Sequence, residues 1–181
     1  MRKSLTLLAA AATLSTGAFA ADYAIDPTHT FATFEIGHFG ASVNRGRFDK
    51  KEGKISFDKA AKTGSVDVSF DVASVNTGTP NFDKHLQSAE ILSAEKFPKA
   101  RFVSTKFQFS GDKVSAVDGN LTLLGKTQPV TLKANQFACY ESPMLKREVC
   151  GGDFETTIDR TAFGVNYGVD WGFPKNVRLV I

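Results

Sequence analysis

Apolar and polar residues alternate along most of the chain, and the alternation is most regular over residues 65–72. The apolar positions there are Val66, Val68, Phe70 and Val72, and serine or aspartate fills all the others. Side chains of a β-strand point alternately to its two faces, so this segment is predicted to be a strand with one buried and one wet face. Antiparallel sheets commonly have this half-buried character.

A second strand is predicted over residues 30–38, where one face carries an apolar stripe that ends in a histidine. The residues of that face are Thr30, Ala32, Phe34, Ile36 and His38. Alternation alone does not decide whether this stripe faces a packed core or a cavity.

The same pattern predicts further strands along the rest of the chain, which makes roughly eight in total. They span 48–58, 102–109, 113–124, 127–137, 154–163 and 176–181. A turn is expected over 40–46. Phe102 and Phe107 fall on opposite parities within one strand, so a β-bulge is expected near Ser104 or Thr105. Strands at this regular spacing suggest a sandwich or a closed barrel, and an eight-stranded barrel can enclose either side chains or one small ligand.

The period changes over residues 81–92, where Phe82, His85 and Leu86 fall at helical spacing. A short helix is predicted there, with Asn81 as its N-cap. In an otherwise all-β chain, such a helix commonly covers an edge or an opening.

The first twenty residues have the pattern of a secretory signal peptide. Two basic residues precede an apolar run over 5–12, and Ala18-Phe19-Ala20 offers a small-x-small cleavage site. We therefore expect residues 1–20 to be removed after Ala20 and residues 21–181 to form one periplasmic domain. The apolar run is too short to be a stable membrane anchor.

The charge and the aromatic content of the chain argue against one class of function and describe the expected interior. The chain has 22 Lys and Arg against 19 acidic residues, and removal of the two cations in the signal leaves 20 against 19. Nucleic-acid binding, which needs a clustered basic face, is therefore not expected. The 16 Phe residues greatly outnumber the single Trp and three Tyr, so the aromatic interior brings few hydrogen-bonding groups.

Cys139 and Cys150 are the only cysteines of the chain. In an exported protein, a disulfide that closes a short loop is expected, with a stabilisation of roughly 3 kcal/mol in the chain-entropy model. A metal or redox pair is less favoured, because the spacing is not CxxC and no histidine lies nearby in the sequence.

His29, His38 and His85 are the only histidines. Catalytic zinc commonly uses three protein ligands, but no two of these residues lie at i, i+2 or i, i+4, and His29 and His38 have opposite parity along one strand. No metal site is therefore expected. His38 and His85 are predicted to donate hydrogen bonds near the mouth of a cavity; the alternative is that each bonds a backbone carbonyl.

Six short motifs, in this order, cover nearly all of the expected mature chain. They are Asp26-Pro27 with His29, Phe34 and His38; Gly46-x-Phe48 with Gly53; His85-Leu86-x-Ser88; Phe97-Pro98-x-Ala100-x-Phe102-x-Ser104; Gly119-x-Leu121-Thr122-Leu123-x-Gly125-Lys126-Thr127; and Asp159-Arg160-x-x-Phe163-Gly164. Together they make the chain resemble the YceI-like family of polyisoprenoid-binding proteins. Two features depart from the family pattern: Ile91-Leu92 stands where paired aromatics are frequent, and the segment between Cys139 and Cys150 is not general.

The resemblance implies an all-β fold, an extended eight-stranded antiparallel β-barrel of lipocalin-like form with a short helix between early strands and a disulfide-closed loop. Its lumen would hold a polyprenyl phosphate, an isoprenoid quinone or a fatty amide. The residues expected to line that lumen are Phe34, Ile36, His38, Phe48, Phe70, Val72, Leu86, Ile91, Phe102, Leu121 and Leu123. The alternative for this set is an ordinary filled core.

A head-group contact is hypothesised at His85 and Arg160, because a guanidinium suits bidentate binding of phosphate. For Asp159 and Arg160 the preferred interpretation is a structural ion pair that pins the last hairpin. Members of the family are not established as enzymes, so we expect a lipid-binding protein without catalytic residues or a cofactor. Whether the protein forms a homodimer is left open. Two other functions remain as alternatives: a structural or stress-protective module without a ligand, and an enzyme that acts on an isoprenoid lipid.

Overall fold

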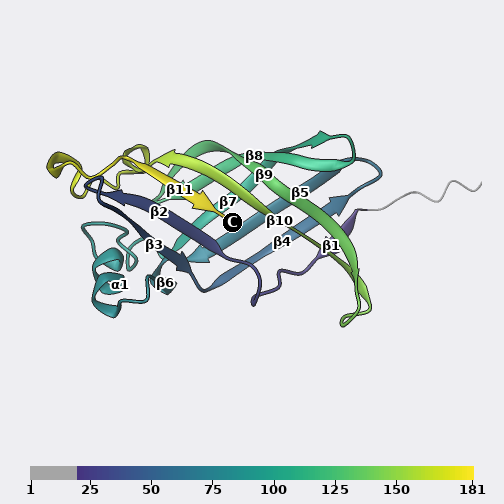
Figure 1. Cartoon of the computed structure of the whole chain (residues 1–181), viewed down its shortest axis with the longest axis horizontal. Coiled ribbons are helices and arrows are strands. Elements are labelled where there is room, and N and C mark those ends of the chain that lie inside the picture. Colours follow the sequence, from purple (N-terminus) through teal and green to yellow (C-terminus); the bar gives the residue numbers. More distant parts are fainter. Residues whose placement is uncertain (1–19) are drawn as a thin grey trace, which may run out of the picture.

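The computed structural model describes residues 20–181, which form a single curled antiparallel sheet (Figure 1). Within these residues the sheet has 11 strands, in the order β1-β4-β5-β7-β8-β9-β10-β11-β2-β3-β6. Their bounds are β1 Ala21–Tyr23, β2 Ala32–His38, β3 Ser42–Phe48, β4 Lys51–Asp58, β5 Thr63–Asp71, β6 Val75–Asn76, β7 Lys99–Ser110, β8 Lys113–Leu123, β9 Lys126–Ser142, β10 Arg147–Asp159 and β11 Asn176–Val180. The all-β antiparallel class is confirmed, whereas the expected count of eight strands is wrong.

The three additional strands, β1, β3 and β6, give no clear alternation in the sequence. β3 occupies most of the segment expected to be a turn over 40–46, and it pairs with β2 from Ser42 to Phe48. Its sequence, SVNRGRF, is mostly polar, so no apolar face indicates a strand. β1 and β6 have three and two residues, which is shorter than a pattern of period 2 can reveal. Very short strands at the two edges of a sheet also limit pairing with other chains.

The sheet curls so far that its β3–β6 end returns to the start of β4 and the end of β5 at one corner. Residues 49–50 join β3 to β4, while the 3-10 helix η1 (Val72–Ser74) joins β5 to β6. Across this corner the Asp49 amide donates to the Ser74 carbonyl at 3.1 Å, and the Asp71 amide donates to the Lys50 carbonyl at 3.0 Å. The sheet therefore wraps around an interior.

A β-bulge bends the sheet where the sequence predicts one. The pairing of β7 with β8 shifts register between Ser104 and Lys106, which confirms the bulge expected near Ser104 or Thr105. Gly119 faces this bend, and a Cβ there would lie 2.5 Å from Cε2 of Phe102. Glycine at this position lets the Phe102 ring lie against the backbone of β8.

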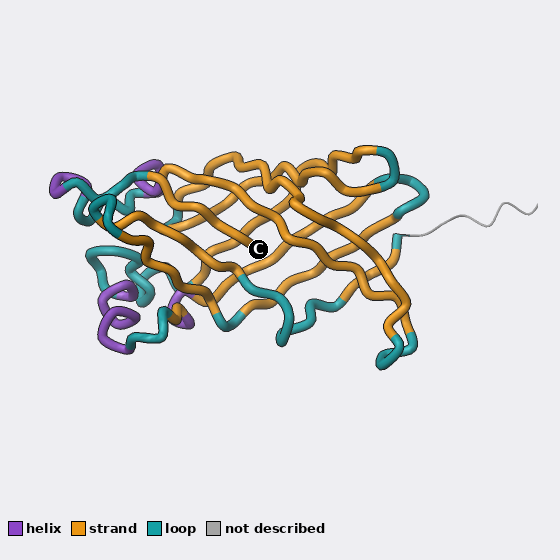
Figure 2. Tube along the Cα trace, viewed as in Figure 1, coloured by secondary structure: helices purple, strands orange, loops and turns teal. Residues whose placement is uncertain are grey.

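The helix α1 (Pro80–Gln87) is shorter than expected and begins two residues earlier. Its N-cap is Thr79 rather than Asn81, because Pro80 supplies the fixed φ and the missing amide that suit the first helical position. Figure 2 shows that α1 and the 3-10 helices gather at one end of the molecule. Among residues 20–181, no helix is long and apolar enough to cross a membrane.

The opposite end of the sheet is filled by a packed core. Phe57, Phe102, Val114, Val117 and Leu132 are buried there in one cluster. The ring of Phe57 also contacts the rings of Phe107, Phe109 and Phe137. The interior is therefore closed by side chains at this end.

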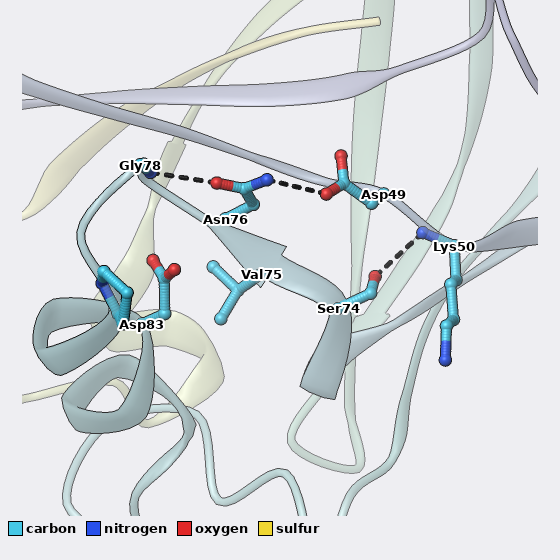
Figure 3. Close-up of a pocket in the computed structure, with 8 residues that line it drawn as sticks. Asp49, Lys50, Ser74, Val75, Asn76, Gly78 and Asp83 are labelled. Carbon is cyan, nitrogen blue, oxygen red and sulfur yellow. Dashed lines mark hydrogen bonds between the residues drawn. The ribbon is translucent and has the colours of Figure 1, made fainter.

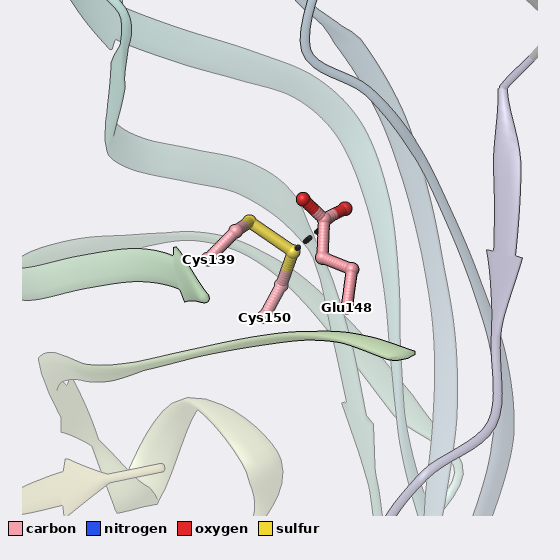
Figure 4. A group of neighbouring side chains, drawn as sticks. All are labelled: Cys139, Glu148 and Cys150. Carbon is pink, nitrogen blue, oxygen red and sulfur yellow. Dashed lines mark hydrogen bonds between the residues drawn. A yellow bond between two sulfur atoms is a disulfide. The ribbon is translucent and has the colours of Figure 1, made fainter. Parts of the chain in front are cut away.

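The predicted disulfide between Cys139 and Cys150 is present, with an S–S distance of 2.05 Å. The loop that it closes is the end of a hairpin. β9 extends to Ser142 and β10 begins at Arg147, so the two cysteines are directly paired residues of adjacent strands. Glu148 lies beside the bridge, with its Oε1 atom 3.8 Å from Cys150 Sγ (Figure 4). These three residues do not form a metal site here, since the sulfurs are bonded to each other and are not thiolates.

The side chain of Glu148 links this hairpin to β1 and to the residue that follows β4. It accepts a hydrogen bond from the Tyr23 hydroxyl at 2.7 Å and forms an ion pair with Lys59. The lysine and the phenol lower the pKa of Glu148, while burial and the neighbouring carboxylate raise the pKa of Tyr23 to about 12.

We expect replacement of both cysteines, Cys139→Ser with Cys150→Ser, to lower the free energy of unfolding by about 3 kcal/mol. The bridge closes a loop of 11 residues in sequence separation, and its loss frees that loop in the unfolded chain. Urea unfolding with and without reductant measures the effect. Reductant should destabilise the wild type and leave the double variant unchanged; an equal effect on both would contradict the prediction.

Candidate functional site

The curled sheet and the helical end together enclose a cavity of about 390 Å³. Its walls come from β2, β3, β5, β7, β8, β9, β10 and β11, from α1 and the residues 91–92 that follow it, from Arg160, and from the segment 165–173. The apolar wall residues include Ala32, Phe34, Ile36, Phe48, Phe70, Phe102, Leu121, Leu123, Val130, Leu132, Ile158, Val177, Leu179 and Ile181. Such a wall has few hydrogen-bonding groups, so it favours an apolar occupant.

The structure places ten of the eleven expected lumen residues on this wall. They are Phe34, Ile36, His38, Phe48, Phe70, Leu86, Ile91, Phe102, Leu121 and Leu123. His85 and Arg160, the residues hypothesised to contact a head group, also line the cavity.

Val72 is the exception, and its placement corrects the expectation. It is only 1% exposed and packs against Ala94 and Ala100 in a separate core cluster. Val72 has the same parity as Phe70, but β5 ends at Asp71 and the chain turns into the 3-10 helix η1. The alternation rule applies only within a strand, so it does not orient Val72.

Sequence reasoning missed the contribution of segment 165–173, which supplies Val165, Tyr167, Trp171 and Phe173 to the wall. This segment contains the 3-10 helix η3 (Val169–Trp171), and glycines with positive φ flank it. It therefore has neither strand nor helix periodicity. The available signal was its aromatic content, with three aromatic residues in the run YGVDWGF.

The aromatic residues at the helical end form the rim of the cavity. The Tyr167 ring lies 4.9 Å from the His85 ring and 5.3 Å from the Trp171 ring, between centroids. The Phe173 ring lies 5.4 Å from the His38 ring. Trp171 is 64% exposed, so this rim meets solvent. We identify it as the mouth, since the opposite end is closed by the packed core.

The three histidines lie in two different environments. His38 and His85 line the cavity, and within residues 20–181 neither imidazole makes a side-chain hydrogen bond, so their nitrogens can bond a ligand. His29 lies outside the wall and contacts the exposed Asp26, with Nδ1 and Oδ2 2.8 Å apart. The Thr28 hydroxyl, the His29 ring and the Thr28 amide together hold the pKa of Asp26 well below its usual range.

Arg160 occupies a 3-10 helix rather than a strand. β10 was expected to continue to Phe163, but it ends at Asp159, and η2 (Arg160–Phe163) follows. The Asp159 carboxylate caps η2 by accepting from the Thr161 amide at 2.8 Å and from the Thr161 hydroxyl at 2.6 Å. Gly164 ends η2 with φ +90°, a left-handed conformation that favours glycine. The expected Asp159–Arg160 ion pair is therefore not formed.

The Arg160 guanidinium is held by backbone carbonyls. Its Nε donates to the Pro174 carbonyl and its Nη1 to the Val165 carbonyl, both at 2.9 Å. Only 6% of the residue is exposed, and burial lowers its pKa. Arginine nevertheless keeps its proton in proteins, so a positive charge lines the cavity.

A second hollow lies on the outer surface near β6, with a volume of about 420 Å³ (Figure 3). Its polar groups bond one another: the Asn76 amide nitrogen donates to Asp49 Oδ2 at 2.8 Å, and the Lys50 backbone amide donates to Ser74 Oγ at 2.9 Å. Asp83, at its edge, accepts from Thr77. These bonds stabilise the corner of the sheet, and we assign no ligand to this hollow.

The profile of the YceI-like domain matches residues 23–181. The chain belongs to the YceI-like family. A UPF0312 protein of Pseudomonas savastanoi pv. phaseolicola is 42% identical over 139 residues, which cover 74% of this chain and 72% of the relative.

Two solved structures share the fold of this YceI-like chain. Burkholderia cenocepacia BcnA has a TM-score of 0.73 at 24% identity, over 86% of this chain and 96% of its own. A polyisoprenoid binding domain from Saccharophagus degradans has a TM-score of 0.61 at 14% identity, over 90% of this chain and 95% of its own. The curled sheet is therefore a fold found in other solved proteins.

The wall of this YceI-like cavity separates two kinds of chemistry along its length. Near the core end it presents Phe102, Leu132 and Ile181, which exclude water from an apolar chain. Near the mouth it adds imidazoles, a phenol and a guanidinium, which can hydrogen-bond a polar group. The arrangement fits an elongated amphiphile with its tail inside and its head at the mouth.

Proposed function

We propose that this protein is an exported lipid-binding protein that holds one long-chain amphiphile in its interior cavity. The observation that carries the proposal is the apolar cavity of about 390 Å³, closed at one end by packed phenylalanines and open at the other through an aromatic rim. This volume lies within the usual range of small-molecule sites, roughly 300–1,000 Å³.

The wall provides affinity through burial rather than through directed bonds. Each methylene moved from water into such a wall contributes roughly 0.8 kcal/mol. Ordering of a flexible tail and the loss of translational freedom offset a large part of this gain. A tail of several isoprene units, or a fatty chain of comparable length, is therefore the smallest occupant with useful affinity.

Three ligand classes fit this description: polyprenyl phosphates, isoprenoid quinones and fatty amides. The fold shared with a domain described as polyisoprenoid binding supports the first two. The protein would sequester or carry such a lipid without changing it, because binding through an apolar wall requires no reactive group.

Export to the periplasm is part of the proposal. It rests on the signal-peptide pattern of residues 1–20, of which 1–19 lie outside the described residues. The Cys139–Cys150 disulfide is consistent with an oxidising compartment. The intact mass of the purified protein tests this point, since export predicts a chain that begins at Ala21.

The lipid proposal predicts that protein purified from a bacterial periplasm carries a bound lipid. Native mass spectrometry should show an adduct that organic extraction removes, and the extract identifies its class. The extracted protein should then take up geranylgeraniol with a change in the emission of Trp171, the single tryptophan, which stands at the mouth.

Two results together would contradict the lipid proposal. The purified protein would be uniformly free of lipid, and the extracted protein would take up neither geranylgeraniol nor a fatty amide such as oleamide. That outcome would favour a structural or stress-protective module with no ligand.

A further inference from the structure

Arg160 lies at the mouth end of the cavity. The Pro174 carbonyl, which accepts from its Nε, directly follows Phe173, and the Phe173 ring contacts His38 at the rim. The Val165 carbonyl, which accepts from its Nη1, lies two residues before the rim residue Tyr167. The guanidinium is thus fixed between two parts of the rim, and the residue lines the cavity.

Among residues 20–181 no carboxylate lies within ion-pair distance of its charge, and the neighbouring Asp159, which bonds Thr161, acts on it only at longer range. The arginine ion pairs among residues 20–181 are formed by Arg45, Arg47, Arg101 and Arg178. All four of these arginines are exposed, whereas Arg160 is buried. A buried charge without a counter-ion in contact is costly, and two carbonyl dipoles with a carboxylate at longer range compensate it only in part.

The guanidinium also retains free donors. Of its five N–H groups, one on Nε and one on Nη1 are bonded, so the second Nη1 hydrogen and both Nη2 hydrogens have no partner within residues 20–181. Ser88 Oγ is the only fully buried side-chain polar atom without a partner in that range. Nη2 therefore keeps accessible surface, and the cavity that Arg160 lines is where this surface can meet a ligand.

We propose that Arg160 binds the anionic head group of the lipid, a phosphate or a carboxylate, and makes the site selective for anionic over neutral amphiphiles. This inference rests on the proposed lipid-binding function. An anion supplies the missing counter-charge and accepts from the Nη1 and Nη2 hydrogens side by side, as carboxylates and phosphates do with arginine. A neutral head can accept the hydrogen bonds but leaves the charge uncompensated.

The orientation of the ligand follows from this contact. With its head at Arg160, the tail extends away from the rim along Leu123 and then Leu121, which pairs with Phe102, toward Leu132. His38 and His85, which line the same cavity and have free ring nitrogens, can donate further hydrogen bonds to the head group.

The test uses two lipids with the same tail, geranylgeranyl phosphate and geranylgeraniol. Extracted wild-type protein is given an equimolar mixture, and native mass spectrometry measures which lipid is bound. We expect the phosphate to be preferred by about tenfold or more, the effect of a charge-assisted hydrogen bond on affinity. Arg160→Gln should reduce the preference to near one while geranylgeraniol still binds, and Arg160→Lys should restore part of it.

Arg101→Gln is the matched control, because Arg101 is an exposed arginine in a bidentate pair with Asp67 at 2.7 and 2.6 Å. It should leave the preference unchanged. If Arg160→Gln does not fold, the preference of the wild type between the two lipids still tests the proposal. Equal binding of geranylgeranyl phosphate and geranylgeraniol overturns the head-group site at Arg160 but leaves the proposed lipid-binding function standing. If neither lipid binds, the proposed function itself fails.

Two further results would overturn the assignment of Arg160. One is a folded Arg160→Gln variant that keeps the full preference for the phosphate. The other is displacement of geranylgeranyl phosphate by inorganic phosphate alone at the same concentration, which would identify a site for free phosphate rather than for a lipid head. Inorganic phosphate that leaves the lipid bound supports the proposal.

Discussion

Replacement of Ala32 by tryptophan is expected to abolish lipid binding and to leave the protein folded. Ala32 lies on β2, pairs with Phe48 of β3 and contributes to the cavity wall. An indole at this position points into the cavity and takes the space of the lipid tail. Loss of contact with only three methylene groups would weaken binding roughly fiftyfold, and a blocked lumen would cost more.

The fold should tolerate Ala32→Trp because the added ring enters a cavity rather than a filled core. Overpacking of a filled core typically costs about 1–3 kcal/mol, and this cost is largely avoided where space exists. Circular dichroism melting measures the stability, and titration with geranylgeraniol measures the binding. Ala138→Trp is the control, because Ala138 is an exposed residue of β9. Wild-type affinity in Ala32→Trp would show that the cavity is not the lipid site.

The fold was predictable from sequence wherever side-chain alternation continued along a strand with a buried face. β5, β7 and β8 follow this pattern, and the bulge between Ser104 and Lys106 was visible as a change of parity. β3 was not predictable, because its polar sequence carries no such signal. Pairing with β2 places it in the sheet, and such pairing is a tertiary effect that local sequence does not encode.

The site was predictable to a similar extent and for the same reason. Strand residues such as Phe34 and Phe70 were assigned to one apolar face by alternation, and both line the cavity. The sequence could not decide between a cavity and a filled interior, because alternating Phe and small residues suit both. The rim formed by Tyr167, Trp171 and Phe173 was missed, since a turn-rich segment has no period.

Arg160 shows a further limit of sequence reasoning. Its neighbour Asp159 suggested an ion pair, but the Asp159 side chain caps η2 and bonds Thr161 instead. Short polar residues at the start of a helical turn commonly bond the backbone in this way. The carbonyl partners of Arg160 lie five and fourteen residues along the chain, in segments without regular structure, and only the fold brings them to it.

Replacement of Phe163 by alanine is expected to produce the opposite result, a large loss of stability with binding retained. Phe163 is only 1% exposed and is buried with Ile158 and Val177 in one core cluster. It packs behind the cavity and is not part of its wall. Removal of such a ring typically costs about 3–5 kcal/mol, which for a domain of this size lowers the melting temperature by roughly 6–20 °C.

The Phe163→Ala variant should still fold at 25 °C if the protein has the usual 5–15 kcal/mol of stability, and it should then bind geranylgeraniol with an affinity close to that of the wild type. Met144→Ala is the control: Met144 is 89% exposed, and its loss should change the stability by no more than about 0.5 kcal/mol. A Phe163→Ala variant that keeps its stability and loses the lipid would place Phe163 on the wall and contradict the cavity described above. Together, Ala32→Trp and Phe163→Ala separate the residues that contact the lipid from those that hold the sheet around it. This separation matters because apolar residues with the same alternation in the sequence serve both purposes.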